Sequence, residues 1–216
     1  MLIVAAAVVG GVILLKGDKK SSTASATNHT YGQGTSGVAV VEYGDFQCPG
    51  CGSFYTIVEK VKEKYKDQIT FQFVNFPLST IHQNAQAAHR AAEAASNQGK
   101  FWEMYGLLYQ NQNVWSSSTN VLPIFESYAS QLGLDNTKFK TDYASAATNS
   151  IIQADIQKGQ QLKITGTPTF VIDGKIVQDN NSIASIDSFS KLIDEAITAK
   201  TGQKPATTNE TSNNSN

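Results

Sequence analysis

The sequence predicts an α/β fold in which a block of helices interrupts a small sheet, and three observations support this class. A strand pattern at 38–43 is followed by a helical pattern at 51–66 and a second strand pattern at 69–76. Residues 80–163 then favour helix almost throughout. A strand–turn–strand signal at 167–178 and a final helical pattern follow. Strands this few and this far apart indicate one sheet with a helical insertion at about 80–163.

The first three elements form a strand–helix–strand unit. The run VAVVEY at 38–43 is apolar and β-branched, which is typical of a buried strand. Between 51 and 66 the apolar side chains recur at helical spacing, and Pro49 suits the first turn, where no backbone donor is lost. The run at 69–76 alternates and then becomes apolar. This order of elements predicts that the two strands pair in parallel.

The insertion is predicted to contain several helices, after which the chain returns to the sheet. The expected helices are 81–96, 101–109, 122–132, 137–147 and 151–162. The sheet is expected to resume with strands 167–172 and 175–178, joined by a tight turn at Asp173-Gly174. An amphipathic helix at 183–200 closes the folded part.

The N-terminal end differs from the rest of the chain. Residues 2–15 are apolar or glycine without a break, so residues 1–20 are interpreted as a membrane anchor or an uncleaved signal. The run is shorter than the roughly 20 residues of a spanning helix, which suggests an anchor whose true start lies upstream. Cleavage after Ala26 would instead give a secreted protein.

The remaining terminal segments are polar. Residues 21–37 are rich in Ser, Thr, Gly and Asn and are predicted to be a flexible linker. Residues 201–216 have a similar composition and are predicted to be a disordered tail. The folded domain is therefore expected at 38–200.

Charge and cysteine content exclude several classes of protein. The formal net charge is −1 and Arg90 is the only arginine, so the chain has no basic cluster of the kind that binds nucleic acid. The chain has two cysteines, and they lie three positions apart. A disulfide scaffold would spread its cysteines to link distant loops, so this pair indicates reactive cysteines rather than a structural cross-link.

The strongest signal is Cys48-Pro49-Gly50-Cys51 at a strand-to-helix boundary. Free backbone donors and the positive end of the helix dipole favour a thiolate over a thiol at the first turn of a helix. Cys48, at the exposed start of this helix, is therefore the candidate nucleophile. Cys51, one turn deeper, is the candidate resolving thiol that attacks the mixed disulfide.

Two other interpretations of this pair compete with redox catalysis. The pair could be half of a zinc site, with His82 and His89 as further ligands, but two helical turns, about 10 Å, would separate these histidines. The pair could also be a structural disulfide, although so short a loop stabilises little. We expect no metal and no cofactor other than the redox-active Cys48–Cys51 disulfide.

The segment VEYGDFQCPGC at 41–51 resembles the active-site segment of DsbA-like thiol-disulfide oxidoreductases of the thioredoxin superfamily, in particular their membrane-anchored single-domain members. The stretches NFPL at 75–78, GKFW at 99–102 and TGTPTF at 165–170 fit the same family. The resemblance covers about 38–200. It implies a thioredoxin-like fold with an inserted helical subdomain.

The resemblance also implies a site and partners. Thr167-Pro168 would form a cis peptide bond facing the cysteines, and this loop would bind an extended substrate together with Pro49 and Gly50. Without the cysteines, Pro168 would be interpreted as an ordinary proline at the start of a strand. The family further implies reduced exported proteins as substrates and a membrane quinone-linked reoxidase.

Acidic and histidine side chains near the cysteines receive different interpretations. Glu42 matches the buried acid of the family, and burial would raise its pKa and suit it to moving the proton of Cys51. The alternative is a carboxylate at a strand edge, facing water. Asp45 is interpreted as an exposed turn residue without a catalytic role, and His82 and His89 as helix-capping or surface groups.

The sequence thus favours a tethered extracytoplasmic oxidase, held at the cell membrane by a signal-anchor, that forms disulfide bonds in exported proteins. No histidine separates Pro49 and Cys51, which suggests a milder oxidant than the extreme members of the family. A disulfide reductase or isomerase is the second hypothesis. A tethered peptide-binding chaperone module is the third.

Overall fold

A computed structural model describes residues 26–205. The strands are β1 (His29–Tyr31), β2 (Val38–Gly44), β3 (Ile69–Asn75), β4 (Thr169–Ile172) and β5 (Lys175–Ile176). The helices are α1 (Pro49–Lys64), α2 (Ala85–Ser96), α3 (Phe101–Gln110), α4 (Gln112–Trp115), α5 (Leu122–Gln131), α6 (Asn136–Ala144), α7 (Ala146–Gln161), α8 (Ile186–Thr201) and the short 3-10 helix η1 (Asn180–Ile183).

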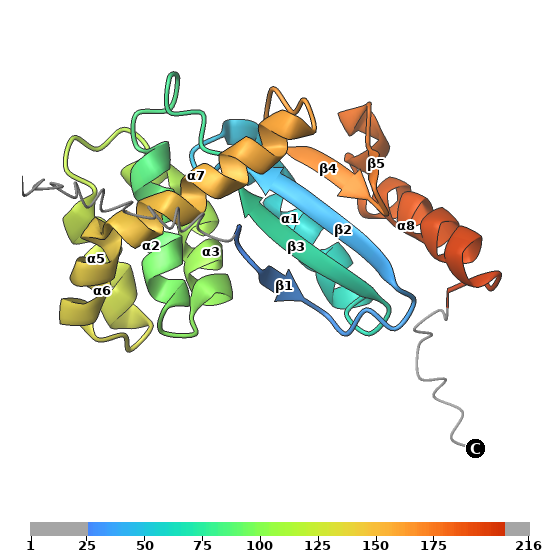
Figure 1. The fold of residues 1–216 in the computed structure, drawn as a ribbon, viewed down its shortest axis with the longest axis horizontal. Helices are drawn as coiled ribbons and strands as arrows, with labels where there is room; N and C mark the ends of the chain where they lie inside the picture. Colours follow the sequence, from blue (N-terminus) through green and yellow to red (C-terminus); the bar gives the residue numbers. More distant parts are fainter. Residues whose placement is uncertain (1–25, 206–216) are drawn as a thin grey trace, which may run out of the picture.

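These elements form one mixed sheet with a helical insertion beside it (Figure 1). The strand order is β1-β3-β2-β4-β5, with β2 and β3 parallel and the other pairs antiparallel. Helices α2 to α7 lie between β3 and β4 in the chain, as the sequence predicts. The α/β class, the parallel strand–helix–strand unit and the helical insertion are therefore confirmed.

The strands alternate their side chains between two apolar layers. Val38 and Val40 of β2 face α1 and α8, where they meet Val58, Phe189 and Ile193 in one buried cluster. Tyr43 of the same strand faces the opposite side, where α7 covers the sheet and Val74 and Phe76 complete a second cluster. A sheet covered on both faces explains why 38–43 reads as continuously apolar.

The linker predicted at 21–37 is wrong over its described part. Residues 29–31 pair with β3 as an edge strand, and Thr27 donates both its amide and its hydroxyl to the carboxylate of Asp155, at 2.9 and 2.8 Å. The indole of Trp102 donates to the carbonyl oxygen of Thr30. Long-range hydrogen bonds specify this strand, and its polar composition gave no sign of them.

Two boundaries in the helical insertion also differ from the prediction. Helix α2 begins at Ala85 rather than at 81, because 78–84 forms turns that hydrogen-bond to the loop after β2. Between α6 and α7, Ser145 adopts an extended backbone, and its hydroxyl accepts a hydrogen bond from the amide of Thr148 as an N-cap.

The termini extend past the described residues. Helix α8 ends at Thr201, and the C-cap residue Gly202 has a φ of 73°, the left-handed conformation that often follows a helix. The predicted anchor at 1–20 and most of the predicted tail, at 206–216, lie outside the described residues. Within 26–205, no helix is long and apolar enough to span a membrane.

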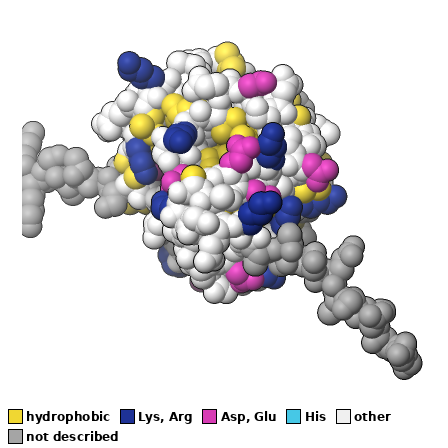
Figure 2. Space-filling model, turned by 90° about the vertical axis from the view of Figure 1, so that its right-hand side faces the viewer, with side chains coloured by type: hydrophobic (Ala, Val, Ile, Leu, Met, Phe, Trp, Pro, Cys, Tyr) yellow, Lys and Arg dark blue, Asp and Glu magenta, His cyan; other side chains and the backbone are white. Residues whose placement is uncertain are grey.

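A groove separates β5 from α8 at one end of the sheet. Figure 2 views this end and shows hydrophobic side chains between charged ones. The groove, of about 490 Å³, is lined by Ile176, Val177, Leu192 and Ala196 among others, and neither cysteine contributes to it.

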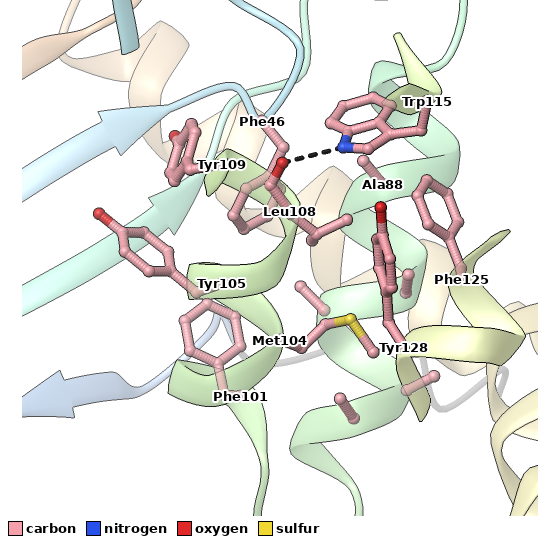
Figure 3. Packing of buried hydrophobic residues seen from close by; sticks show 14 of the residues in the cluster. Phe46, Ala88, Phe101, Met104, Tyr105, Leu108, Tyr109, Trp115, Phe125 and Tyr128 are labelled. Carbon is pink, nitrogen blue, oxygen red and sulfur yellow. Dashed lines mark hydrogen bonds between the residues drawn. The ribbon is translucent and has the colours of Figure 1, made fainter. Parts of the chain in front are cut away.

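The largest buried cluster joins the helical insertion to the loop after β2. Phe46, from that loop, packs against Tyr105 and Tyr109 of α3, with ring centroids 5.8 and 5.1 Å apart (Figure 3). The Trp115 indole donates to the carbonyl oxygen of Leu108 at 2.9 Å, the bond drawn in Figure 3. The helical insertion therefore packs directly against the segment that carries the cysteines.

Candidate active site

Both cysteines lie where β2 passes into α1. Cys48 is the N-cap residue, with an extended backbone, and Pro49 opens the helix. Cys51 follows within the first turn. Both cysteines carry free thiols in this structure. Only 8% of Cys48 and 1% of Cys51 is exposed, so the nucleophile is more covered than the sequence suggested.

The loop before β4 covers Cys48. The Thr167–Pro168 peptide bond is cis, which confirms the prediction from the family resemblance. Cys48 Sγ lies 3.3 Å from the carbonyl oxygen of Thr167. A Cβ added to Gly50 would lie 3.3 Å from Cδ of Pro168, so a residue without a side chain suits this close approach. The structure therefore brings together 48–51 and 167–168, which are far apart in the sequence.

The surroundings of Cys48 favour its thiolate. A hydrogen bond from the Cys51 thiol lowers the pKa of Cys48 most, burial opposes this, and Thr167 and the amides of Cys51 and Gly50 lower it further, to about 5. The Thr167 hydroxyl is buried and makes no hydrogen bond among the described residues, so it is free to turn toward this sulfur. Cys48 is thus anionic at neutral pH and a good leaving group.

The surroundings of Cys51 have the opposite effect. Burial, the hydrogen bond to Cys48 and the nearby charge of Glu42 raise the pKa of Cys51 well above its ordinary value. The amide of Asp45 donates to Cys51 Sγ at 3.5 Å, which favours the anion slightly. The pair is therefore asymmetric, with an anionic outer sulfur and a protonated inner one.

Glu42 is buried close to this inner sulfur. It is 1% exposed, which agrees with the predicted buried acid rather than with a water-facing carboxylate. Burial raises its pKa to about 8, against the opposing effects of the Lys62 charge and a hydrogen bond from Tyr105. The Tyr105 hydroxyl donates to Glu42 Oε2 at 3.3 Å. A carboxyl that titrates near neutral pH suits proton exchange, and its role toward Cys51 stays a prediction.

Lys62 is a buried cation that sequence reasoning missed. It is 4% exposed, and its ammonium lies 3.9 Å from the Trp102 ring centroid and 2.7 Å from Glu59 Oε1. Tyr31 and Tyr105 lie within 5.0 Å of the same ammonium. The signal available in the sequence was a lysine directly after Val61 on the buried side of α1. Its charge moderates the rise in the pKa of Glu42.

Asp45 and the two histidines differ from their predicted places. Asp45 and His89 are completely buried, and only 15% of the His82 side chain is exposed. The Asp45 carboxylate accepts hydrogen bonds from the amides of Gln47 and Leu78. The interpretation of Asp45 as exposed and of the two histidines as surface groups is therefore wrong. Hydrogen bonds from Gln47, Leu78 and His82 compensate the burial of Asp45, and His89 bonds to Asn75 instead.

An open groove continues from the proline loop. It encloses about 630 Å³ and is lined by the backbone and side chains of 162–169 and 176–180, including Thr167 and Pro168. Its polar lining suits an extended peptide whose backbone needs hydrogen-bond partners. Substrate binding by Thr167, Pro168, Pro49 and Gly50 stays a prediction that this geometry accommodates.

Such a fold, with an acidic and a buried thiol at one helix end, defines a dithiol redox protein. The comparison with protein families agrees. A family model described as thioredoxin matches residues 24–195, and the chain therefore belongs to this family.

Full-length relatives are named for disulfide formation. The chain is 30% identical over 207 residues to the "Probable disulfide bond formation protein D" of Bacillus cereus, covering 91% of this chain and 92% of that protein. The protein of the same name from Bacillus anthracis is 29% identical over 205 residues, covering 91% of each. The chain is thus a DsbA-like member of the family.

A second group of relatives is much longer. The "Na(+)/H(+) antiporter NhaA 1" of Salinispora arenicola is 34% identical over 148 residues, which cover 68% of this chain. The match covers 22% of that antiporter's length.

Solved structures support the fold. BdbD from Bacillus subtilis superposes with a TM-score of 0.68 at 22% identity, covering 78% of this chain and 91% of that one. The α-DsbA1 protein of Wolbachia pipientis gives 0.66 at 20% identity, covering 79% and 91%. A thioredoxin-like fold with an inserted helical domain is therefore established.

Proposed function

We propose that this protein is a thiol-disulfide oxidoreductase that forms disulfide bonds in exported proteins through Cys48 and Cys51. The observation that carries the proposal is the opposed acidity of the two thiols, with the pKa of Cys48 lowered to about 5 and that of Cys51 raised. A stabilised thiolate favours the reduced form of the couple, which makes the disulfide form an oxidant.

The exchange has two steps. A substrate thiolate attacks Cys48 Sγ, the Cys48–Cys51 bond breaks, and Cys51 leaves and takes up a proton. The second substrate thiolate attacks the substrate sulfur of this mixed disulfide, and Cys48 leaves as a thiolate. Two electrons pass from the substrate dithiol to the protein, which is left reduced. Glu42 supplies the proton that Cys51 takes up and receives it again on reoxidation.

The reduction potential of the couple tests this proposal. We expect equilibration with glutathione buffers to give a value clearly more oxidising than about −270 mV, the value of thioredoxin. A potential at or below that value would support the reductase alternative instead.

Replacing Cys48 by Ser tests the peptide-binding alternative. Oxidative refolding of a reduced substrate protein should lose its dependence on this protein in the Cys48→Ser variant. Activity that survived the substitution would favour a chaperone module.

We also propose an extracytoplasmic location at the cell membrane, with 1–20 as the tether and a quinone-linked membrane protein as the reoxidant. The apolar run at 2–15 and the disulfide-forming relatives support this location. Labelling Cys48 in intact cells with a membrane-impermeant thiol reagent tests it. Labelling only after lysis would contradict it.

A further inference from the structure

Asp45 touches both cysteines through its backbone. Its amide donates to Cys51 Sγ at 3.5 Å, and its carbonyl oxygen accepts the amide of Cys48 at 3.1 Å. The phenol of Tyr109 donates to the same carbonyl oxygen. The orientation of this peptide segment therefore determines whether the Asp45 amide points at Cys51 Sγ.

The Asp45 side chain fixes this segment from the other side. Oδ1 accepts the amide of Gln47 at 2.8 Å, and Oδ2 accepts the amide of Leu78 at 2.9 Å. His82 Nδ1 lies 2.7 Å from Oδ2 and donates to it, because a carboxylate accepts hydrogen bonds. Each oxygen of the carboxylate is thus anchored to a different part of the loop structure.

His89 lies next to this carboxylate without a hydrogen bond to it. Its Nδ1 lies 2.6 Å from Oδ1 of Asn75, whose amide nitrogen donates to Glu93 and Asp155 at 2.6 and 2.8 Å. His89 Nδ1 is therefore the donor, and Nε2 carries the lone pair. Nε2 lies 4.0 Å from Asp45 Oδ1 and has no hydrogen-bond partner among the described residues. His89 thus contributes no donor to Asp45, and the anchoring falls to His82 and the two amides.

We infer that Asp45, held by His82, is a positioning residue for the resolving thiol. This inference rests on the proposed function. Before Cys51 can attack the mixed disulfide its thiol must lose a proton, and the Asp45 amide is the backbone donor already placed on the sulfur that becomes anionic. Losing the His82–Asp45 bond frees the loop to rotate this donor away, while the helix amides around Cys48 stay in place.

Reaction of the reduced protein with dithiobis(nitrobenzoate) separates the two steps. Attack by Cys48 releases one nitrothiobenzoate anion at a rate that depends on reagent concentration. Attack by Cys51 on the Cys48 mixed disulfide then closes the Cys48–Cys51 bond and releases a second anion in a unimolecular phase. Both anions are coloured, so stopped-flow absorbance reports each phase.

The variants are His82→Phe, which keeps a ring but removes the donor, and His82→Asn, whose amide can replace Nδ1. We expect His82→Phe to slow the second phase about tenfold, the loss of one hydrogen bond to a charged group, with the first phase changed less than twofold. His82→Asn should restore the second phase to within about threefold of wild type. Asp45→Asn, which lacks the second acceptor oxygen, should resemble His82→Phe.

The outcomes separate this inference from the proposed function. An unchanged second phase in His82→Phe, or equal slowing of both phases, would overturn the positioning role even if Asp45→Asn fails to fold. A His82→Asn variant as slow as His82→Phe would also overturn it. A wild-type protein that releases no second anion would contradict the proposed function itself.

Discussion

Two buried acids flank the inner cysteine, and they are built in opposite ways. Glu42 accepts one long hydrogen bond, from Tyr105 at 3.3 Å, and lies near the buried Lys62. Asp45 is equally buried but accepts short hydrogen bonds from two amides and His82. Two equally buried carboxyl groups therefore differ in their hydrogen bonds: burial raises the pKa of Glu42, which accepts one long bond, whereas Asp45 holds two loops together through short ones.

The largest expected effect is on folding stability. Asp45→Ala leaves the amides of Gln47 and Leu78 without their acceptor, and we expect the free energy of unfolding to fall by about 3 kcal/mol. Glu42→Gln removes a carboxyl whose raised pKa lowers stability at pH 7, so it should raise the free energy of unfolding at that pH rather than lower it. Urea denaturation of the reduced proteins measures both, and equal losses would remove the distinction between the two acids.

A second expectation concerns pH. The pKa of Glu42 is about 8 in the folded protein and 4.5 in its ordinary state, so the folded state binds more protons between these values. Stability contributed by this group is therefore lost as pH rises from about 4.5 to 8, with a slope of up to about 1.4 kcal/mol per unit. Denaturation at several pH values should show a flatter profile in Glu42→Gln. A profile identical to wild type would contradict the raised pKa.

Of the two acids beside Cys51, Glu42 is the one whose pKa the charge of Lys62 lowers. Lys62→Met removes the cation that opposes the rise in the pKa of Glu42, and we expect the pH midpoint of the second nitrothiobenzoate phase to rise by about one unit. Lys64→Met is the matched control, since Lys64 lies on the same helix but bonds to Ser190. A shift of the same size in both variants would mean that losing any positive charge on this helix moves the midpoint, and would contradict a specific effect of Lys62 on Glu42.

The smallest effect should come from the proline loop. The Thr167 hydroxyl helps to lower the pKa of Cys48, so Thr167→Val should raise the midpoint of Cys48 alkylation from about 5 by about half a unit. Iodoacetamide labelling followed by mass spectrometry measures this midpoint. An unchanged midpoint would mean that the Cys51 thiol and the helix amides are sufficient to lower the pKa of Cys48.

The sequence predicted the parts of this site that depend on local patterns. The order of strands and helices follows from hydrophobic periodicity, and the cysteine pair at a helix start follows from spacing and Pro49. The cis bond at Pro168 and the burial of Glu42 came from the family resemblance, and the structure agrees with both. The lysine at 62 and the strand at 29–31 were missed, because each is specified by residues distant in the sequence.

Local sequence patterns were therefore enough to predict the class of fold and the atoms that carry the chemistry. The acidity of those atoms and the roles of the acids beside them depend on tertiary contacts. The physical reason is that a pKa depends on which charges, donors and apolar groups lie within a few ångströms, and here they come from β2, α1, α3 and the loops at 78–82 and 167–168. Asp45 illustrates this most clearly, because its partners Leu78 and His82 make a residue that looks like a surface turn into a buried anchor.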